Sequence, residues 1–273
     1  MKKWLIRIAW VIFVGIIIAL LFLARNAQEK KPVSKPAIVI HVEGENAFLT
    51  EDELFVRLKR KRLIFDGQTK KQLNVAAIEK YIHSMSEVKE TKVFTNIGDT
   101  WKIDVKVRKP IARIFNRYGE TFYLDEEGVI MKASNLHTAR VVVVTGNIKD
   151  RITSKNVKEI INNKFLKSIQ KLDEIYRISY YVCNDPLMRA LIGQIHFDKK
   201  GDFVLIPIVG GQKIIFGSAK TTEDVQEKFE KLKIFYKEAI PFEGWNKYKE
   251  IGLKYKNQIV CKTVDGYTEE NKQ

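Results

Sequence analysis

The sequence predicts a mixed α+β protein with a single N-terminal transmembrane helix, a small domain of order β-α-α-β-β, and a β-rich domain with two interrupting helices. Three observations predict this class. A long uncharged apolar run lies near the N-terminus. Helical and strand periodicities follow one another in the next segment, and the later apolar runs are mostly short and separated by turn residues.

The N-terminal apolar run has the length of a membrane span. Ile8 to Ala24 carries no charge, and with Trp4 to Ile6 added a helix of this length is about 32 Å long, enough to cross the hydrocarbon core of a bilayer. A cleavable signal peptide needs small residues before the cut, where Arg25 lies. The predicted segments are therefore a cytoplasmic tail (1–7), an uncleaved transmembrane helix (8–24) and a polar linker (25–36).

Basic residues flank both ends of this run, so the positive-inside rule does not decide its orientation. The short tail and the long chain after the run favour a single-pass type II protein, with the N-terminus inside and the bulk of the chain outside the cytoplasm. Only Cys183 and Cys261 are cysteines, which excludes a disulfide-dense scaffold. Two unpaired buried thiols are favoured, and a bridge between them stays open.

The net charge of +15 raises the question of nucleic acid or anionic membrane surfaces as partners. The densest basic run is "RLKRKR", Arg57 to Arg62. No zinc finger or RNA-recognition motif accompanies it, so no nucleic-acid partner is expected. On a helix such a run is most often a solvated face, and contact with anionic lipid headgroups is the functional alternative.

The small domain is predicted over residues 37–109. It begins with the strand "IVIHV", and Thr50 and Glu53 have the spacing of a capping box at the start of a first helix. The core-facing stripe of a second helix consists of Val75, Ile78, Ile82 and Met85. After a strand near 88–95, Trp101 to Val107 alternates apolar and polar residues, as in a strand buried on one face.

The β-rich domain is predicted over residues 110–262, followed by a flexible tail, 263–273. Short strands are predicted at "IARIFNRY", "TFYLD", "VIMKA", "RVVVVTG", "ALIGQIHFD", "FVLIPIV" and "QKIIFG". The stripe of the first interrupting helix is Val157, Ile161, Phe165, Ile169 and Leu172. The stripe of the second is Val225, Phe229, Leu232 and Tyr236. Both stripes predict core-facing surfaces.

A search for catalytic chemistry predicts none. Asp125, Glu126 and Glu127 lie in "LDEEGV", where Asp and Gly occupy the first and fourth positions of a type I turn, and adjacent side chains there diverge. The four histidines lie in separate elements without metal-ligand spacing. We therefore expect no catalytic residue, no metal site, no cofactor and no small-molecule substrate.

Three passages, "VKVRKPIARIF", "GETFYLDEEGVIM" and "IGLKYKNQIVCK", resemble the FtsQ/DivIB family of bacterial cell-division proteins. The resemblance implies a POTRA (polypeptide-transport-associated) domain at 37–109 and the family's β domain at 110–262. It also implies a non-enzymatic divisome scaffold in the cytoplasmic (inner) membrane at the division site, which binds FtsB and FtsL and connects to FtsK, FtsW and FtsI. Lys254 departs from the family, in which many members carry Arg before the tyrosine.

The resemblance places the FtsB contact at the closing strands. The corresponding residues here are Tyr255, Lys256, Asn257, Ile259, Val260 and Lys262. A late strand often lies at a sheet edge, where free backbone groups accept another chain by strand addition. Two alternatives stay open. In the first, Tyr255 is an ordinary core residue and the tail merely covers the edge. In the second, the chain is a membrane-anchored envelope enzyme or chaperone whose site is assembled from dispersed residues and would require a convergent polar pocket.

Overall fold

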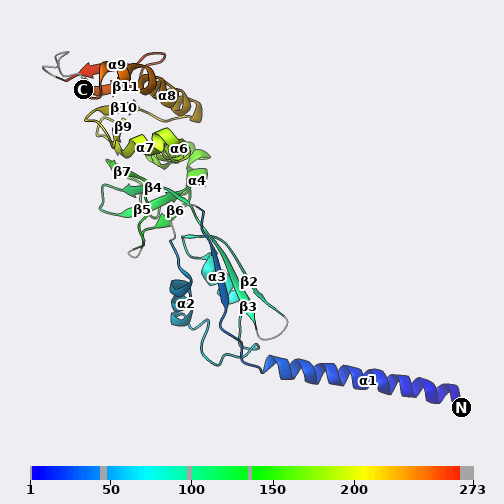
Figure 1. Cartoon of the computed structure of the whole chain (residues 1–273). Helices are drawn as coiled ribbons and strands as arrows, with labels where there is room; N and C mark the ends of the chain where they lie inside the picture. The colour runs from blue at the N-terminus through cyan, green and yellow to red at the C-terminus, as the bar shows by residue number, and fades with distance from the viewer. Residues whose placement is uncertain (1, 44–47, 97–99, 135–136, 265–273) are drawn as a thin grey trace. The chain divides into compact units, whose positions relative to one another are not determined.

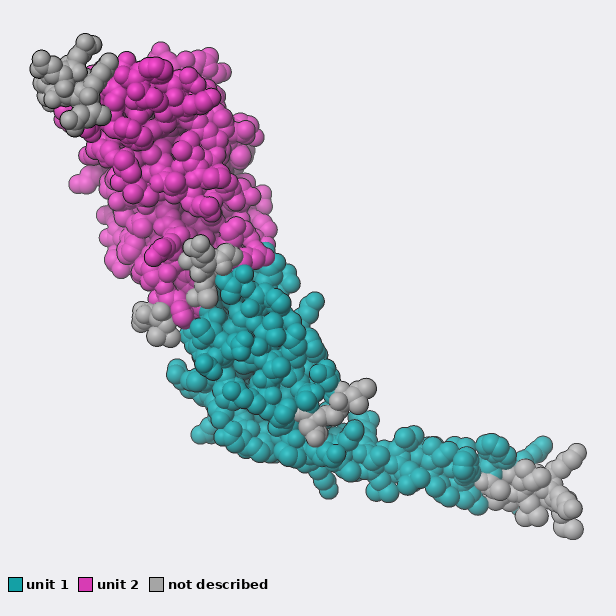
Figure 2. All heavy atoms as spheres, in the orientation of Figure 1, with its two compact units in different colours: residues 1–42, 49–107 teal, residues 43–48, 108–273 magenta. Residues whose placement is uncertain are grey.

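The computed structural model describes residues 2–43, 48–96, 100–134 and 137–264 (Figure 1). The chain divides into two compact units: residues 1–42 with 49–107, and residues 43–48 with 108–273 (Figure 2). The predicted mixed α+β class is confirmed. The predicted flexible tail, 263–273, lies outside the described residues except for Thr263 and Val264.

The N-terminal helix, α1 (Lys2–Glu29), is longer at both ends than the predicted span. Within the described residues it is the one helix that is long and apolar enough to cross a membrane, and the span assigned on this basis, Trp10–Glu29, has no buried residue. An apolar surface of this size that no part of the protein covers is typical of a helix that contacts lipid.

The first unit has the predicted element order. Its elements are β1 (Ala37–His41), α2 (Glu51–Arg60), α3 (Val75–His83), β2 (Val88–Thr95) and β3 (Trp101–Val107). The strands form a sheet of order β1-β3-β2, in which β1 is parallel and β2 antiparallel to the central strand β3. The parallel β1–β3 pair requires a long crossover connection, which α2 and α3 provide.

The core of the first unit follows the predicted periodicities. Every second residue of β3 is buried, and these side chains pack against the buried faces of α2 and α3. The buried residues are Trp101, Ile103, Val105 and Val107 of β3, Leu54 and Leu58 of α2, and Ile78 and Ile82 of α3. The Thr50 hydroxyl accepts a hydrogen bond from the Glu53 amide at 3.2 Å, as a capping residue does. The Glu53 carboxylate also accepts a hydrogen bond from Arg57 at 2.5 Å.

The second unit contains one large sheet of order β12-β11-β10-β9-β8-β7-β4-β5-β6 in the described residues. The strands are β4 (Pro110–Phe115), β5 (Thr121–Asp125), β6 (Ile130–Lys132), β7 (Val142–Gly146), β8 (Ile192–Phe197), β9 (Phe203–Pro207), β10 (Lys213–Gly217), β11 (Tyr248–Gly252) and β12 (Val260–Thr263). The pairs β4–β7, β7–β8 and β10–β11 are parallel and the others antiparallel. The seven predicted strands are all present, in the predicted order.

The helices of the second unit outnumber the two predicted. They are α4 (Val157–Ile161), α5 (Lys164–Ile169), α6 (Leu172–Asn184), α7 (Pro186–Leu191), α8 (Thr222–Ile234), η1 (Phe235–Ala239) and α9 (Ile240–Glu243). The predicted stripe of the second helix is correct, since all four of its residues are buried in α8 and η1.

The predicted stripe of the first helix is wrong. Phe165, at its centre, is 70% exposed, and Ile161 and Ile169 are also exposed. The Asn163 side chain accepts hydrogen bonds from the amides of Phe165 and Leu166 and so starts a new helix there. This cap breaks the helical register, because residues on either side of it no longer share one face.

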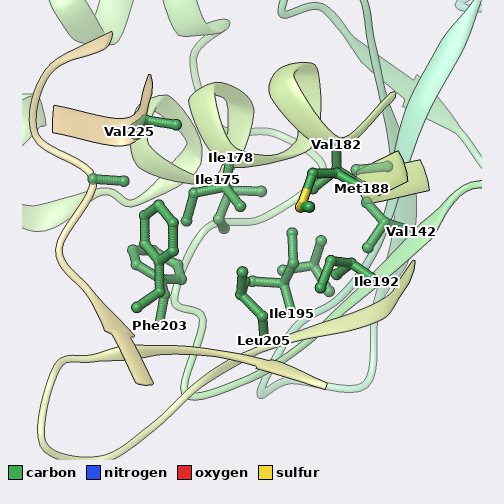
Figure 3. Packing of buried hydrophobic residues seen from close by; sticks show 14 of the residues in the cluster. Val142, Ile175, Ile178, Val182, Met188, Ile192, Ile195, Phe203, Leu205 and Val225 are labelled. Atoms are coloured by element: carbon green, nitrogen blue, oxygen red, sulfur yellow. The ribbon is translucent and has the colours of Figure 1, made fainter. Parts of the chain in front are cut away.

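The core of the second unit instead lies between α6, α7 and α8 and the sheet. Figure 3 shows the apolar side chains of α6 pointing toward those of β7, β8 and β9. The labelled residues are Val142, Ile175, Ile178, Val182, Met188, Ile192, Ile195, Phe203, Leu205 and Val225. The core residues of β7 and of β9 are spaced two apart, and the apolar core residues of α6 are three or four apart, as expected where a helix covers a sheet.

Candidate partner-binding edge

The predicted partner-binding segment reaches the edge of the large sheet. β12 is the terminal strand in the sheet order, and within the described part of the chain only β11 pairs with it. The amide of Val264, just after β12, donates to the Lys247 carbonyl at 2.9 Å. Because successive strand residues direct their backbone groups to opposite sides, the groups of Cys261 and Thr263 face away from β11. This edge can accept a further strand.

The side chains of β12 and of the residue before it divide between two faces. Ile259 and Cys261 are half-buried and pack against the core of the second unit, whereas Val260 and Lys262 are exposed. Opposite Lys262 in the register lies Glu250 of β11, and the Lys262 Nζ is 2.6 Å from the Glu250 carboxylate. This hydrogen bond from Lys262 lowers the pKa of Glu250. The cross-strand pair ties the edge strand to its neighbour.

Four of the six predicted site residues lie outside the strand. Tyr255, Lys256 and Asn257 belong to the turn between β11 and β12, and Ile259 directly precedes β12. Asn257 has φ +58°, a left-handed conformation that ends strand geometry. Tyr255 is 54% exposed, so the alternative that it is an ordinary core residue is wrong.

This turn is held against a neighbouring helix. The Lys231 Nζ of α8 donates to the Tyr255 carbonyl at 2.9 Å. Just before the turn, Lys254 pairs with the Asp202 carboxylate. Each of the two contacts is made by a lysine ammonium. Lys254, the lysine that departs from the family pattern, therefore has a structural role in this chain, as the partner of Asp202.

A hollow beside the edge strand was not predicted from the sequence. It has a volume of about 470 Å³ and is lined by Gly211, Trp245, Asn246, Tyr248, Lys249 and Val264. Trp245 and Val264 are both exposed, and Val264 directly follows β12. Tyr248 and Lys249 of its lining belong to β11, the strand that pairs with β12. The sequence signal for it is an apolar aromatic residue in the polar stretch "EGWNKYKE" before the last two strands.

The two cysteines are unpaired and half-buried. Cys183 lines another hollow, of about 310 Å³, with a mainly apolar lining and two basic residues, Arg140 and Arg189. No carboxylate or imidazole belongs to the described lining, so this hollow lacks the acid and base groups of a hydrolytic site. Burial raises the pKa of the Cys183 thiol, which makes it a poor nucleophile.

The acidic run after β5 forms a turn, as predicted. Asp125 is buried, and its Oδ1 accepts the amides of Glu127 and Val129 at 3.0 and 2.6 Å. The expected divergence of the carboxylates is only partly right, because Asp125 and Glu127 both bind Arg108, at 2.8 and 3.2 Å. Lys109 pairs with Glu126 at 3.3 Å, so two internal cations offset part of the charge of the three carboxylates. Among the described residues, no group of three or more His, Cys, Asp or Glu side chains is arranged to hold a metal ion.

Comparison with known proteins gave one finding for this half of the chain. The family model described as FtsQ/DivIB, C-terminal related, matches residues 109–262, which is more than half of the sequence. The matched segment runs from the residue before β4 to within β12. Comparison with curated proteins gave no match.

Proposed function

The chain belongs to the FtsQ/DivIB family of cell-division proteins, and we propose that it is a non-enzymatic scaffold of the divisome that binds its partners through the sheet edge at β12. Family membership gives the chain a role in cell division and partners within the division complex. The proposal names the scaffold role, the strand that is used and the partner that uses it. The observation that carries it is the terminal position of β12 in the sheet.

Anchoring is the first part of the proposal. The unburied apolar surface of α1 would cross the cytoplasmic membrane once, with the N-terminus in the cytoplasm and the chain after α1 outside it. The first unit has the β-α-α-β-β order of a POTRA domain, and we assign it this role. Such a protein would present its large sheet to other membrane-anchored division proteins at the septum.

The second part is strand addition by FtsB, which is paired with FtsL. An incoming strand would form backbone hydrogen bonds with Cys261 and Thr263, which face away from β11, and these bonds would provide much of the affinity. Val260 and Lys262 would lie beside its side chains on the exposed face. FtsK, FtsW and FtsI would connect through other surfaces of the same scaffold.

A proline at an outward-facing amide tests this mode directly. Thr263→Pro removes a donor on the open side of β12 and leaves the donors that face β11 in place, whereas Thr263→Ala keeps the donor and is the matched control. Co-purification of the FtsB–FtsL pair with the full-length chain should be strongly reduced by the proline and little changed by the alanine. Equal capture by both variants would place the contact elsewhere. Circular dichroism of each variant would establish that the sheet is intact.

A further inference from the structure

The long connection between α2 and α3, residues 61–74, is attached to the chain just after the membrane helix. The Lys71 amide donates to the carbonyl of Glu29, the last residue of α1, at 3.1 Å, and the Lys70 amide donates to the Lys31 carbonyl at 3.1 Å. Val33 donates in turn to Gln68 at 2.8 Å. These bonds hold the 61–74 loop beside the C-terminal end of α1. The loop therefore lies near the membrane surface for either orientation of the helix.

The 61–74 loop is an ordered platform. Its buried residues include Ile64, Gln68 and Leu73. The Gln68 side chain is 3% exposed, and its amide nitrogen donates to the carbonyls of Leu63 at 3.4 Å and Gln72 at 3.2 Å. A buried amide with several partners fixes the loop backbone, because each lost bond would leave a polar group unsatisfied. The backbone positions that carry the exposed side chains of this loop are therefore set by the fold.

The exposed side chains of this region are cationic and aromatic. Phe65 is 47% exposed at the tip of the loop. Exposed cations lie on the loop and the end of α2, and on the segment after α1 that is bonded to the loop: Lys59, Arg60, Lys61, Arg62, Lys71, Lys30, Lys31 and Lys35. Of these, Lys59 is paired with Asp66, and Lys35 and Lys59 lie over the Phe55 ring. Arg57, in contrast, is bound by Glu53 and Glu87 inside the fold and contributes little to the surface charge.

We propose that the 61–74 loop, together with Lys30 and Lys31, docks on the membrane surface at the end of α1 and binds anionic phospholipid headgroups. Phe65 would enter the boundary between headgroups and acyl chains, and the surrounding lysines and arginines would contact lipid phosphates. For the "RLKRKR" run, this proposal adopts contact with anionic lipid headgroups in place of the solvated face. Backbone attachment to the end of a membrane span favours lipid over an acidic protein segment, because the headgroups are already within reach of the loop.

The inference rests on the proposed anchoring of α1, and one experiment tests both separately. The full-length chain with Cys183→Ser, Cys261→Ser and Phe65→Cys is labelled at position 65 with a fluorophore that is sensitive to water. It is then reconstituted in lipid nanodiscs of phosphatidylcholine alone or with phosphatidylglycerol. Co-elution with the discs reports the anchor. A shift of the emission to shorter wavelength, with quenching by nitroxide-labelled lipid, reports docking.

Docking should produce the shift in discs that contain phosphatidylglycerol, and about 0.5 M salt should reduce it. Lys61→Glu with Lys71→Glu should abolish the shift. The matched control, Lys199→Glu with Lys200→Glu, changes the same charge on exposed residues of the second unit and should leave it unchanged.

Equal emission in the two kinds of disc, or an equal effect of the two charge variants, would overturn the docking alone. Failure of the chain to co-elute with discs would overturn the anchor and the docking with it.

Discussion

The buried carboxyl of Asp150 gives the fold a pH dependence whose size follows from its surroundings. Its side chain is 1% exposed. Its Oδ2 accepts the Lys171 amide at 3.0 Å, and its Oδ1 has no hydrogen-bond partner among the described residues. Burial raises the pKa of Asp150 from 3.8 to about 6, against the backbone hydrogen bonds that lower it, and the nearby charge of Asp173 adds to the rise.

The sign of the effect follows from the order of the two pKa values. Between about pH 4 and pH 6 the folded state holds a proton that the unfolded state has lost, so the free energy of unfolding falls as the pH rises. The pKa difference, from 3.8 to about 6, corresponds to about 3 kcal/mol at roughly 1.4 kcal/mol per pKa unit. This part of the stability is fully present below about pH 4 and is lost above about pH 6.

Asp150→Asn keeps an acceptor for the Lys171 amide and removes the ionisation. At pH 7 we expect the unfolding temperature of the variant to lie roughly 6 to 12 °C above that of the unsubstituted chain, from about 2–4 °C per kcal/mol. Near pH 4 the two proteins should unfold at the same temperature. Thermal unfolding of the detergent-solubilised protein at several pH values measures the difference. The matched control is Asp66→Asn, whose 92% exposed side chain should change stability by no more than about 1 kcal/mol. Destabilisation of the Asp150→Asn variant at pH 7, or equal stabilisation at pH 4 and pH 7, would refute the reasoning.

Three further predictions concern the core, a turn and the anchor. Val105→Asp places a charge at a position with 0% exposure in the centre of β3 and should unfold the first unit in a proteolysis assay, whereas Thr95→Asp at the exposed end of β2 should not. Gly128→Ala adds a Cβ only 2.6 Å from the Val157 Cβ and should cost about 1–3 kcal/mol more in urea unfolding than Gly119→Ala, which has a similar positive φ but open space; equal costs would mean that Val157 moves away freely. The intact mass of membrane-extracted protein should include residues 1–25, and a chain that starts after Ala24 or Ala27 would show that α1 is cleaved.

The parts of the fold that the sequence predicted are those set by local periodicity. The alternation from Trp101 to Val107 and the stripe of α8 each lie within one unbroken element, so the pattern alone identifies the buried face. The stripe from Val157 to Leu172 failed because the Asn163 cap interrupts the helix. The adjacent asparagines Asn162 and Asn163 give little warning of such a break, since asparagine also occurs on exposed helical positions.

The candidate site was predicted in part for a similar reason. The pattern identified an apolar strand near Val260, but the register of Tyr255 depends on the left-handed conformation of Asn257, which periodicity does not report. The hollow at Trp245 and the shared contact of Arg108 with Asp125 and Glu127 bring together residues from separate elements. Such tertiary juxtapositions are not encoded by spacing along the chain, and only the folded arrangement shows them.

The central claim is that a partner adds a strand to β12, and hydrogen exchange at single amides tests it most directly. The amides of Cys261 and Thr263 face away from β11, whereas that of Val264 already donates to Lys247. In the free chain we expect the two outward amides to exchange much faster than the Val264 amide. Addition of FtsB with FtsL should slow Cys261 and Thr263 strongly and Val264 little. Unchanged exchange at Cys261 and Thr263 in a chain that captures the pair would contradict strand addition at this edge.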